Sequence, residues 1–363
     1  MVASGGSGVC FGPLSLTKRL PPELISSVMI HVDGSYGEGG GQIIRTAVSL
    51  AVITGEPIEI ANIRAKRKKP GLQPQHLAAV KAAAELCGAK MRGDAVGSVH
   101  LEFKPAGPVK PGEYAFDIGT AGSAPLVAQT VIMPLVLAGG ASKVSVTGGT
   151  HNPMAPTSDY LERVYGNALR RMGIDIEVRS PRAGFYPAGG GLVEVEIKGG
   201  QLRPIKMTAR APIRDLEAIV TTSKLRPDVA ERAEKVIRHQ LGNEPALRVR
   251  IEDKPSTGPG AAVVIVAEHE HGVAGATVLG SRGKLMEVVT GEACKLYIEW
   301  RDGNAAIDEH LADQLVLPAC FDNGESAWTT PVVTEHLRTV VWLVQKFFPI
   351  TFDLGETVRI SRT

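Results

Sequence analysis

A glycine-rich segment near the N-terminus has the residue types of a phosphate-binding loop. The segment DGSYGEGGGQIIR, residues 33–45, places three consecutive glycines before a predicted helix, with Glu38 in the loop and Arg45 inside the helix. Backbone N–H groups at such a helix start attract anions. A carboxylate repels phosphate, so a functional Glu38 would hold a divalent metal ion that bridges the phosphates. The alternative is a structural turn, and the segment has neither a Walker A nor a Rossmann pattern.

A basic segment follows, which could bind a polyanion. Residues 61–84 contain six basic side chains and no acidic one, although the net charge of the whole chain is only +2. The motif IRAKRKKPGLQPQH ends at a predicted helix start, where Gln75 and His76 lie beside free N–H groups that favour an anionic ligand. A solvated charged loop is the alternative interpretation.

Two segments near the C-terminus carry further polar side chains. EHLADQLVLP predicts a helix whose polar start holds Asp313 and Gln314 near a ligand. In TPVVTEHLRT, Thr330 is a candidate N-cap and Pro331 suits the first helical position, which places His336 in the second turn at the border of an apolar stripe. A histidine at such a border is most often a structural group, so its position alone assigns no chemistry.

Two glycine-containing turns complete the set of candidate segments. GGTHNPMAP, residues 148–156, precedes a predicted helix, and GFYPAGGG, residues 184–191, precedes a predicted strand. Such turns could narrow a groove, and their aromatic side chains could stack on a base. A connecting, structural role is favoured for both, and His151 is not assigned as a ligand.

The composition is that of a soluble globular protein, and no membrane partner is expected. Of the 363 residues, 44% are hydrophobic and 21% are charged, which is typical of a globular protein. The four cysteines are far apart and lack CxxC spacing, so neither a disulfide framework nor a zinc site is expected. No apolar run approaches the roughly 20 residues of a membrane span, and a cytoplasmic location is expected.

Helix-like and strand-like runs recur in one rhythm over three stretches of the chain. The predicted helices are residues 42–54 and 74–87, 122–137 and 156–172, and 308–320 and 331–347. The predicted strands are residues 29–32, 57–63, 143–147, 175–179, 192–197, 327–329, 351–354 and 358–360. Because some strand pairs look antiparallel, the pattern favours an α+β fold over a doubly wound sheet.

A different block interrupts these stretches. Residues 209–304 contain predicted helices at 227–241 and 285–300, predicted strands at 246–251 and 261–267, and a turn at 258–260. This block predicts a small αβ domain inserted into a large domain of residues 29–208 and 305–363. Residues 1–28 are expected to be a poorly ordered leader.

Seven motifs in one order resemble the RNA 3'-terminal phosphate cyclase family. They are EGGGQIIR, IRAKRKKPGLQPQH, GTAGSAPLVAQT, GGTHNPMAP, GFYPAGGG, EHLADQLVLP and TEHLRT. The resemblance implies three repeated βαβαββ-like units in a large domain with an inserted smaller αβ domain. It also implies an ATP-dependent conversion of an RNA 3'-phosphate to a 2',3'-cyclic phosphate, through a covalent His-AMP and an RNA-adenylate.

The resemblance assigns roles to individual residues. His336 matches the family's nucleophile, and Glu38 matches a residue near the metal ion and the triphosphate. The matches to ATP-binding positions are Gln129, His310, Leu311, Ala312, Asp313 and Gln314. The matches to phosphate or RNA-end contacts are Arg45, Arg64, Arg67, Gln75 and His76. The implied partners are ATP, Mg²⁺ or Mn²⁺, and RNA with a 3'-phosphate end, and a homodimer is a further expectation.

Two positions depart from the family pattern. Val340 follows HLRT where a polar residue is expected, and His310 stands where an aromatic residue is usual, which affects adenine packing.

Two rival functions are considered. A non-catalytic RNA-binding scaffold on the same fold would lack the nucleophile that His336 supplies. A carboxyvinyl transferase would need six repeats in two similar halves, whereas this chain shows three and an unrelated insertion.

Overall fold

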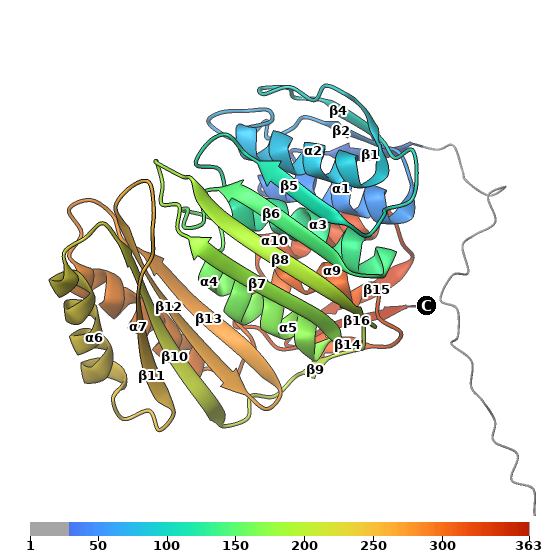
Figure 1. Cartoon of the computed structure of the whole chain (residues 1–363). Helices are drawn as coiled ribbons and strands as arrows, with labels where there is room; N and C mark the ends of the chain where they lie inside the picture. The colour runs from blue at the N-terminus through green and yellow to red at the C-terminus, as the bar shows by residue number, and fades with distance from the viewer. Residues whose placement is uncertain (1–28, 363) are drawn as a thin grey trace, which may run out of the picture.

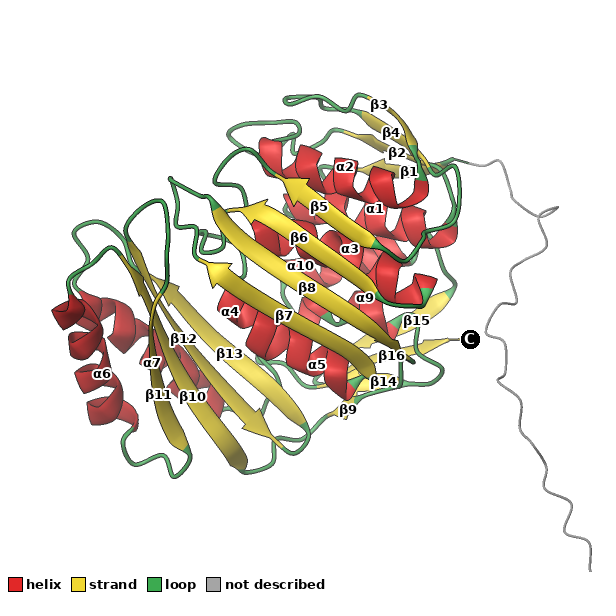
Figure 2. Ribbon diagram, in the orientation of Figure 1, coloured by secondary structure: helices red, strands yellow, loops and turns green. Residues whose placement is uncertain are grey.

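The computed structural model describes residues 29–362 and arranges their strands in four sheets of four strands each (Figures 1 and 2). The predicted leader, residues 1–28, lies outside the described residues. Helices pack against each sheet, and one continuous apolar core joins the first three sheets and reaches one face of the fourth. Among residues 29–362, no helix has both the length and the apolar character needed to cross a bilayer.

The first sheet has the strand order β1-β2-β4-β3. Its elements are β1 (Ile30–Asp33), α1 (Gly41–Thr54), β2 (Ile58–Ala61), α2 (Pro74–Cys87), β3 (Lys90–Arg92) and β4 (Leu101–Lys104). Both helices end at a glycine in the left-handed conformation, with φ of 78° at Gly55 and 63° at Gly88. Such glycines terminate helices because they adopt positive φ without steric cost.

The second sheet has the order β5-β6-β8-β7. Its elements are β5 (Glu113–Asp117), α3 (Ala124–Ala138), β6 (Ser142–Gly148), α4 (Ser158–Tyr160), a π-helical turn (Leu161–Tyr165), α5 (Gly166–Arg171), β7 (Ile174–Arg182) and β8 (Gly191–Gly200). Helix α3 begins at the Ser123 N-cap and is apolar on most of its surface, which is why it lies at the centre of the core.

The third sheet has the order β15-β16-β14-β9. Its elements are β9 (Lys206–Met207), α8 (Glu309–Gln314), α9 (Val316–Ala319), β14 (Ser326–Trp328), α10 (Glu335–Val344), β15 (Ile350–Leu354) and β16 (Val358–Arg362). In each of the first three sheets, one parallel strand pair is extended by two antiparallel strands. This mixture of helices with partly antiparallel sheets confirms the α+β class.

The fourth sheet lies between β9 and α8 in the sequence. Its elements are β10 (Ile213–Ser223), α6 (Pro227–Leu241), β11 (Leu247–Asp253), β12 (Gly260–His269), β13 (Gly272–Leu279) and α7 (Met286–Asp302). Helices α6 and α7 cover one face of this sheet and enclose a second apolar core (Figure 1). The sequence pattern predicts both helices and the strands β11 and β12, but not β10 and β13.

The predicted start of the last helix is wrong. Helix α10 begins at Glu335, and its N-cap is Thr334, whose hydroxyl accepts a hydrogen bond from the Leu337 N–H at 3.1 Å. The Thr330–Pro331 pair has the right residue types for a helix start, but the competing cap at Thr334 prevails and residues 330–334 are not helical. His336 therefore lies in the first turn of the helix, not the second.

A buried polar network joins the fourth sheet to the second. The Asp159 carboxylate is fully buried and lies 2.9 Å from both His151 Nε2 and Lys254 Nζ, the latter just after β11. Thr221 of β10 also donates to it, at 3.3 Å. Burial raises the pKa of Asp159, but contacts with His151 and Lys254 outweigh this effect and hold the pKa well below its usual range. The network therefore links the two sheets through a charged group.

We expect Lys254→Met to destabilise the protein strongly, because it leaves the buried Asp159 charge without its cation. The free energy of unfolding should fall by about 3 kcal/mol in urea denaturation. The control is Lys295→Met, which removes an exposed lysine of α7 whose nearest carboxylate, on Glu299, is 3.7 Å away. That variant should unfold like the wild type. Equal effects of the two substitutions would contradict the role given to the buried network.

Candidate active site

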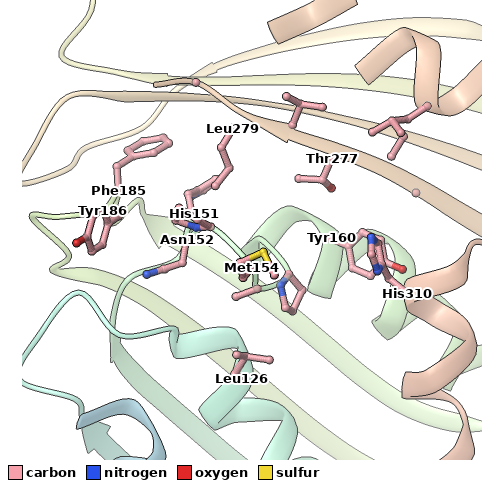
Figure 3. Close-up of a pocket in the computed structure, with 18 of the residues that line it drawn as sticks. Leu126, His151, Asn152, Met154, Tyr160, Phe185, Tyr186, Thr277, Leu279 and His310 are labelled. Atoms are coloured by element: carbon pink, nitrogen blue, oxygen red, sulfur yellow. The ribbon is translucent and has the colours of Figure 1, made fainter. Parts of the chain in front are cut away.

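A cleft of about 1900 Å³ lies between helices of the first three sheets and the face of the fourth sheet's β13 (Figure 3). Segments far apart in the sequence line it, including the start of α1, the start of α2, α3, α8 and α10. Nearly all the residues singled out from the sequence converge here: Glu38, Arg45, Arg64, Arg67, Gln75, His76, Gln129, His310, Asp313, Gln314 and His336. Leu311 and Ala312 do not, because their side chains are fully buried in the core.

The start of α1 forms an anion-attracting centre in this cleft. Its N-cap, Gly40, has no side chain, and the first turn carries no acidic residue, so the N–H groups of that turn stay free for a ligand. A Cβ on Gly41 would lie 2.2 Å from His76 Nε2 and 2.9 Å from an Arg45 side-chain nitrogen. Glycine is thus required there, because both side chains converge on the helix start.

The charge of Arg45 is available to a ligand. Within residues 29–362, its guanidinium has no carboxylate oxygen within 4.0 Å. Burial lowers the pKa of Arg45 to about 10, and the Asp313 charge opposes that shift, so the group stays positive at neutral pH. A half-buried cation without a paired anion, next to a helix N-terminus, favours a phosphate group.

His76 adds a neutral hydrogen-bond donor to this centre. Its Nδ1 accepts from the Gln73 N–H at 3.1 Å, which places the ring proton on Nε2, the atom nearest Gly41. Burial, followed by repulsion from Arg45 and Arg64, lowers the pKa of His76 to about 3. The adjacent Gln75 accepts from the Ser123 N–H through its Oε1 at 3.1 Å, and the other end of its amide lies 3.5 Å from His76 Nε2.

The two arginines of the basic segment have different surroundings. Arg64 donates to the carbonyl oxygens of Lys69 at 2.6 Å and Gly71 at 3.0 Å, so it shapes its own loop. Arg67 reaches across to the glycine-rich loop, where its guanidinium lies 3.0 Å from Glu38 Oε2. Arg67 and Glu38 thus form one side of the anion centre.

Gln42 connects His336 with Asp313. The Oε1 atom of Gln42 accepts from His336 Nδ1 at 2.8 Å, and its Nε2 donates to Asp313 Oδ2 at 2.5 Å. Because Nε2 is committed to Asp313, Oε1 can only accept, and the proton of the His336 ring lies on Nδ1. The lone pair of His336 Nε2 then faces the cleft, with Glu38 Oε2 3.4 Å away.

Burial and the nearby cations keep the His336 ring neutral. Burial lowers the pKa of His336, and the Glu38 carboxylate, 3.4 Å from Nε2, opposes that shift. Burial also raises the pKa of Asp313 to about 7, with a further contribution from Asp308. A neutral imidazole with a free nitrogen is the form that can act as a nucleophile.

A clamp between the glycine-rich loop and α10 positions Glu38. The ring of Tyr36 stacks on Trp342 with centroids 3.9 Å apart and an angle of 6° between the planes. Gly37, with φ of 52°, packs so closely on Thr339 that a Cβ would lie 2.5 Å from its hydroxyl oxygen. These contacts and the Gln42 contacts were not found from the sequence, since each joins residues hundreds of positions apart.

One end of the cleft is a cavity with mixed apolar and amide walls. Gln129 of α3 donates to Gln314 Oε1 at 2.7 Å. The exposed His310 lies at the same end of the cleft as Tyr160, because the His310 N–H and the Tyr160 hydroxyl both donate to Asp308 Oδ1 (Figure 3). The Tyr160 hydroxyl donates to Asp308 at 2.7 Å, and the Gly275 N–H of β13 donates to the same carboxylate at 2.9 Å. This arrangement suits a planar, partly polar ligand.

The buried state of His76 predicts a pH dependence of stability. The pKa of His76 is about 3 in the folded protein and near 6.5 in the unfolded chain, so the unfolded chain binds more protons between these values. Lowering the pH from 6.5 to 4 should therefore destabilise the wild type relative to His76→Asn, by up to about 1.4 kcal/mol per pH unit. Urea denaturation at several pH values measures this slope, and parallel slopes would refute the neutral, buried histidine.

Comparisons with known proteins agree on one family. A family model described as RNA 3'-terminal phosphate cyclase matches residues 36–354. The protein of that name from Nostoc punctiforme is 43% identical to this chain, over 92% of this chain and 98% of its own length. The one from Methylococcus capsulatus is 43% identical, over 88% of this chain and 91% of its own length. The one from Salmonella agona is 41% identical, over 90% of this chain and 94% of its own length. Among solved structures, the enolpyruvyl transferase NikO from Streptomyces tendae is 16% identical and matches 48% of this chain and 33% of its own chain. Its TM-score of 0.26 is too low to bear on fold or function. The chain belongs to the RNA 3'-terminal phosphate cyclase family.

Proposed function

We propose that the protein uses ATP to convert an RNA 3'-phosphate into a 2',3'-cyclic phosphate, with His336 as the residue that carries AMP. The observation that carries the proposal is the Gln42 hydrogen bond to His336 Nδ1, which leaves Nε2 unprotonated in the cleft. Family membership supports the overall reaction, and this geometry supports the assignment of the nucleophile.

The proposed reaction has three displacements at phosphorus. First, His336 Nε2 bonds to the α-phosphorus of ATP while the bond to the pyrophosphate oxygen breaks. Second, an oxygen of the RNA 3'-phosphate bonds to the same phosphorus and the P–N bond breaks, which returns the imidazole. Third, the 2'-hydroxyl oxygen bonds to the RNA phosphorus, AMP leaves and the hydroxyl proton passes to solvent. AMP is the better leaving group, so the closure proceeds where direct loss of an oxide would not.

The anion centre at the start of α1 would hold the reacting phosphates. Free N–H groups, the Arg45 cation and the His76 Nε2–H converge there, next to His336. Charge develops on phosphate oxygens during each displacement, and fixed donors stabilise it without reorganisation. Arg67 would join them once a ligand competes for its present partner, Glu38.

The adenosine of ATP would occupy the end of the cleft near Gln129, His310 and Gln314. The amide pair can turn toward the polar edge of a base, and the His310 ring offers a stacking surface in place of the aromatic residue usual in the family. Asp313 would contribute through Gln42 rather than by direct contact. Leu311 and Ala312 would only support α8, because their side chains face the core.

Glu38 is the residue proposed to hold Mg²⁺ or Mn²⁺. Within the described residues, no three histidine, cysteine or carboxylate side chains converge as a metal site. A single carboxylate beside a phosphate-binding centre nevertheless fits Mg²⁺, which commonly uses one or two carboxylates together with substrate phosphates and water. When bound, the ion would neutralise phosphate charge.

We also propose that the first three sheets are repeats of one βαβαββ unit and that residues 209–304 form an inserted domain. The shared strand order of the three sheets supports the repeat, and the second apolar core, between the fourth sheet and helices α6 and α7, supports the insertion. A homodimer and a cytoplasmic location stay predictions.

Incubation with α-labelled ATP and Mg²⁺ or Mn²⁺ tests the nucleophile. The wild type should form an acid-labile, alkali-stable adduct, and His336→Ala should form none. The control is His239→Ala, which changes an exposed histidine of α6 and should label normally. Labelling of the His336 variant would refute the assignment, and wild-type protein that labels but leaves RNA 3'-phosphate ends unchanged would refute the cyclase reaction.

The role of Gln42 can be tested by the rate of labelling. Gln42→Leu removes the acceptor that fixes the proton on His336 Nδ1, so the rate should fall about tenfold, as expected for the loss of one hydrogen bond worth about 1.4 kcal/mol. Gln345→Leu, an exposed position at the end of α10, should leave the rate unchanged. An equal rate for Gln42→Leu and wild type would contradict the positioning role.

A further inference from the structure

A second, smaller groove of about 700 Å³ opens beside the cleft. It is lined without any charged side chain by Gln75, Thr120, Ala121, Gly122, Asn152, Pro153, Met154, Ala155, Tyr186 and Pro187. Seven of these residues also line the main cleft: Gln75, Asn152, Pro153, Met154, Ala155, Tyr186 and Pro187. The groove is therefore continuous with the site that holds His336.

A turn held by several contacts leaves the Tyr186 side chain exposed in this groove. The preceding ring, Phe185, is buried and stacks on His151 with centroids 4.6 Å apart. A Cβ on Gly260 would lie 2.0 Å from the Phe185 ring, so only glycine fits. The Gly189 N–H closes the turn by donating to the Phe185 carbonyl at 2.9 Å. These contacts fix the backbone, and Tyr186 itself stays 65% exposed.

Met154 is a second exposed apolar side chain in the same groove. It is 92% exposed, and its backbone has a φ of 61°, in the left-handed region that a non-glycine residue seldom adopts. Its neighbour Asn152 is tied down by a hydrogen bond from its Nδ2 to the Ala121 carbonyl. The loop thus holds a flexible, polarisable side chain in the groove that Tyr186 also lines, at a cost in backbone strain.

The position of the groove distinguishes it from the end of the cleft proposed for adenosine. Tyr186 and Asn152 lie at one end of the cavity, and Tyr160 and His310 lie at the other (Figure 3). Gln75, which lines the groove, directly precedes His76 of the anion centre. A molecule whose phosphate occupies the anion centre could therefore extend into this groove while ATP occupies the opposite end.

We infer that the groove binds a nucleobase at the 3' end of the RNA, within its last two nucleotides, stacked on Tyr186 with Met154 against it. The inference rests on the proposed cyclase function. Uncharged, apolar and amide walls suit a base rather than a phosphate, and unpaired bases of single-stranded RNA stack on exposed aromatic rings. The rigid turn lowers the ordering cost of that contact.

Steady-state cyclisation of a short 3'-phosphate RNA tests the inference. Tyr186→Ala should raise the KM for the RNA about tenfold, the effect of losing about 1.4 kcal/mol of stacking. Its rate of labelling by α-labelled ATP should equal that of the wild type, because the base does not take part in that step. Tyr186→Phe keeps the ring and should retain a near-normal KM. An unchanged KM for Tyr186→Ala, or an equal loss in labelling and cyclisation, would overturn the inference.

RNAs that lack one base identify the stacked partner. An abasic residue at the terminal or the penultimate position should raise the wild-type KM as much as Tyr186→Ala does, and on that RNA the two proteins should become equal. If Tyr186→Ala weakens binding of both abasic RNAs as much as of intact RNA, no base of the last two nucleotides contacts Tyr186 and the inference fails. Wild-type protein that cyclises no RNA would instead defeat the proposed function itself.

Discussion

Three side chains, His336, Gln42 and Asp313, form a hydrogen-bonded chain that joins helices α10, α1 and α8. With Asp313 as an ionised carboxylate, the carboxamide of Gln42 satisfies both neighbours by turning its oxygen toward the imidazole and its nitrogen toward the carboxylate. That orientation sets the position of the imidazole proton. Because Gln42 lies in the first turn of α1, the helix that aims the nucleophile is also the helix whose N-terminus attracts phosphate.

Contacts from other elements hold the residues around the start of α1 in place. The Tyr36–Trp342 stack holds the glycine-rich loop against α10, so Glu38 stays near the imidazole that it faces. His76 and Arg45 supply one neutral and one charged donor at the same point, and both depend on the absence of a side chain at Gly41. The fourth sheet closes the opposite side of the cleft and is attached through the buried Asp159 network.

Much of this arrangement was predictable from local sequence, and the rest was not. Helix α2 was predicted with both of its ends because Pro74 and Gly88 are strong local signals, and the family motifs located Glu38, Asp313 and His336. The start of α10 was mispredicted because Thr330 and Thr334 are both competent caps. The role of Gln42 and the Tyr36–Trp342 stack were not predicted, because both depend on tertiary contacts that no local pattern encodes. Leu311 and Ala312 belong to a functional motif, but a one-turn helix must bury its apolar face, and their side chains form that face.

The central claim is that His336 reacts through Nε2 because Gln42 occupies Nδ1. The most direct measurement is ¹⁵N–³¹P coupling in the adduct formed from ATP and protein labelled with ¹⁵N-histidine. We expect a single phosphoramidate, with phosphorus bonded to Nε2 of His336. Phosphorus on Nδ1, or on a different residue, would contradict it.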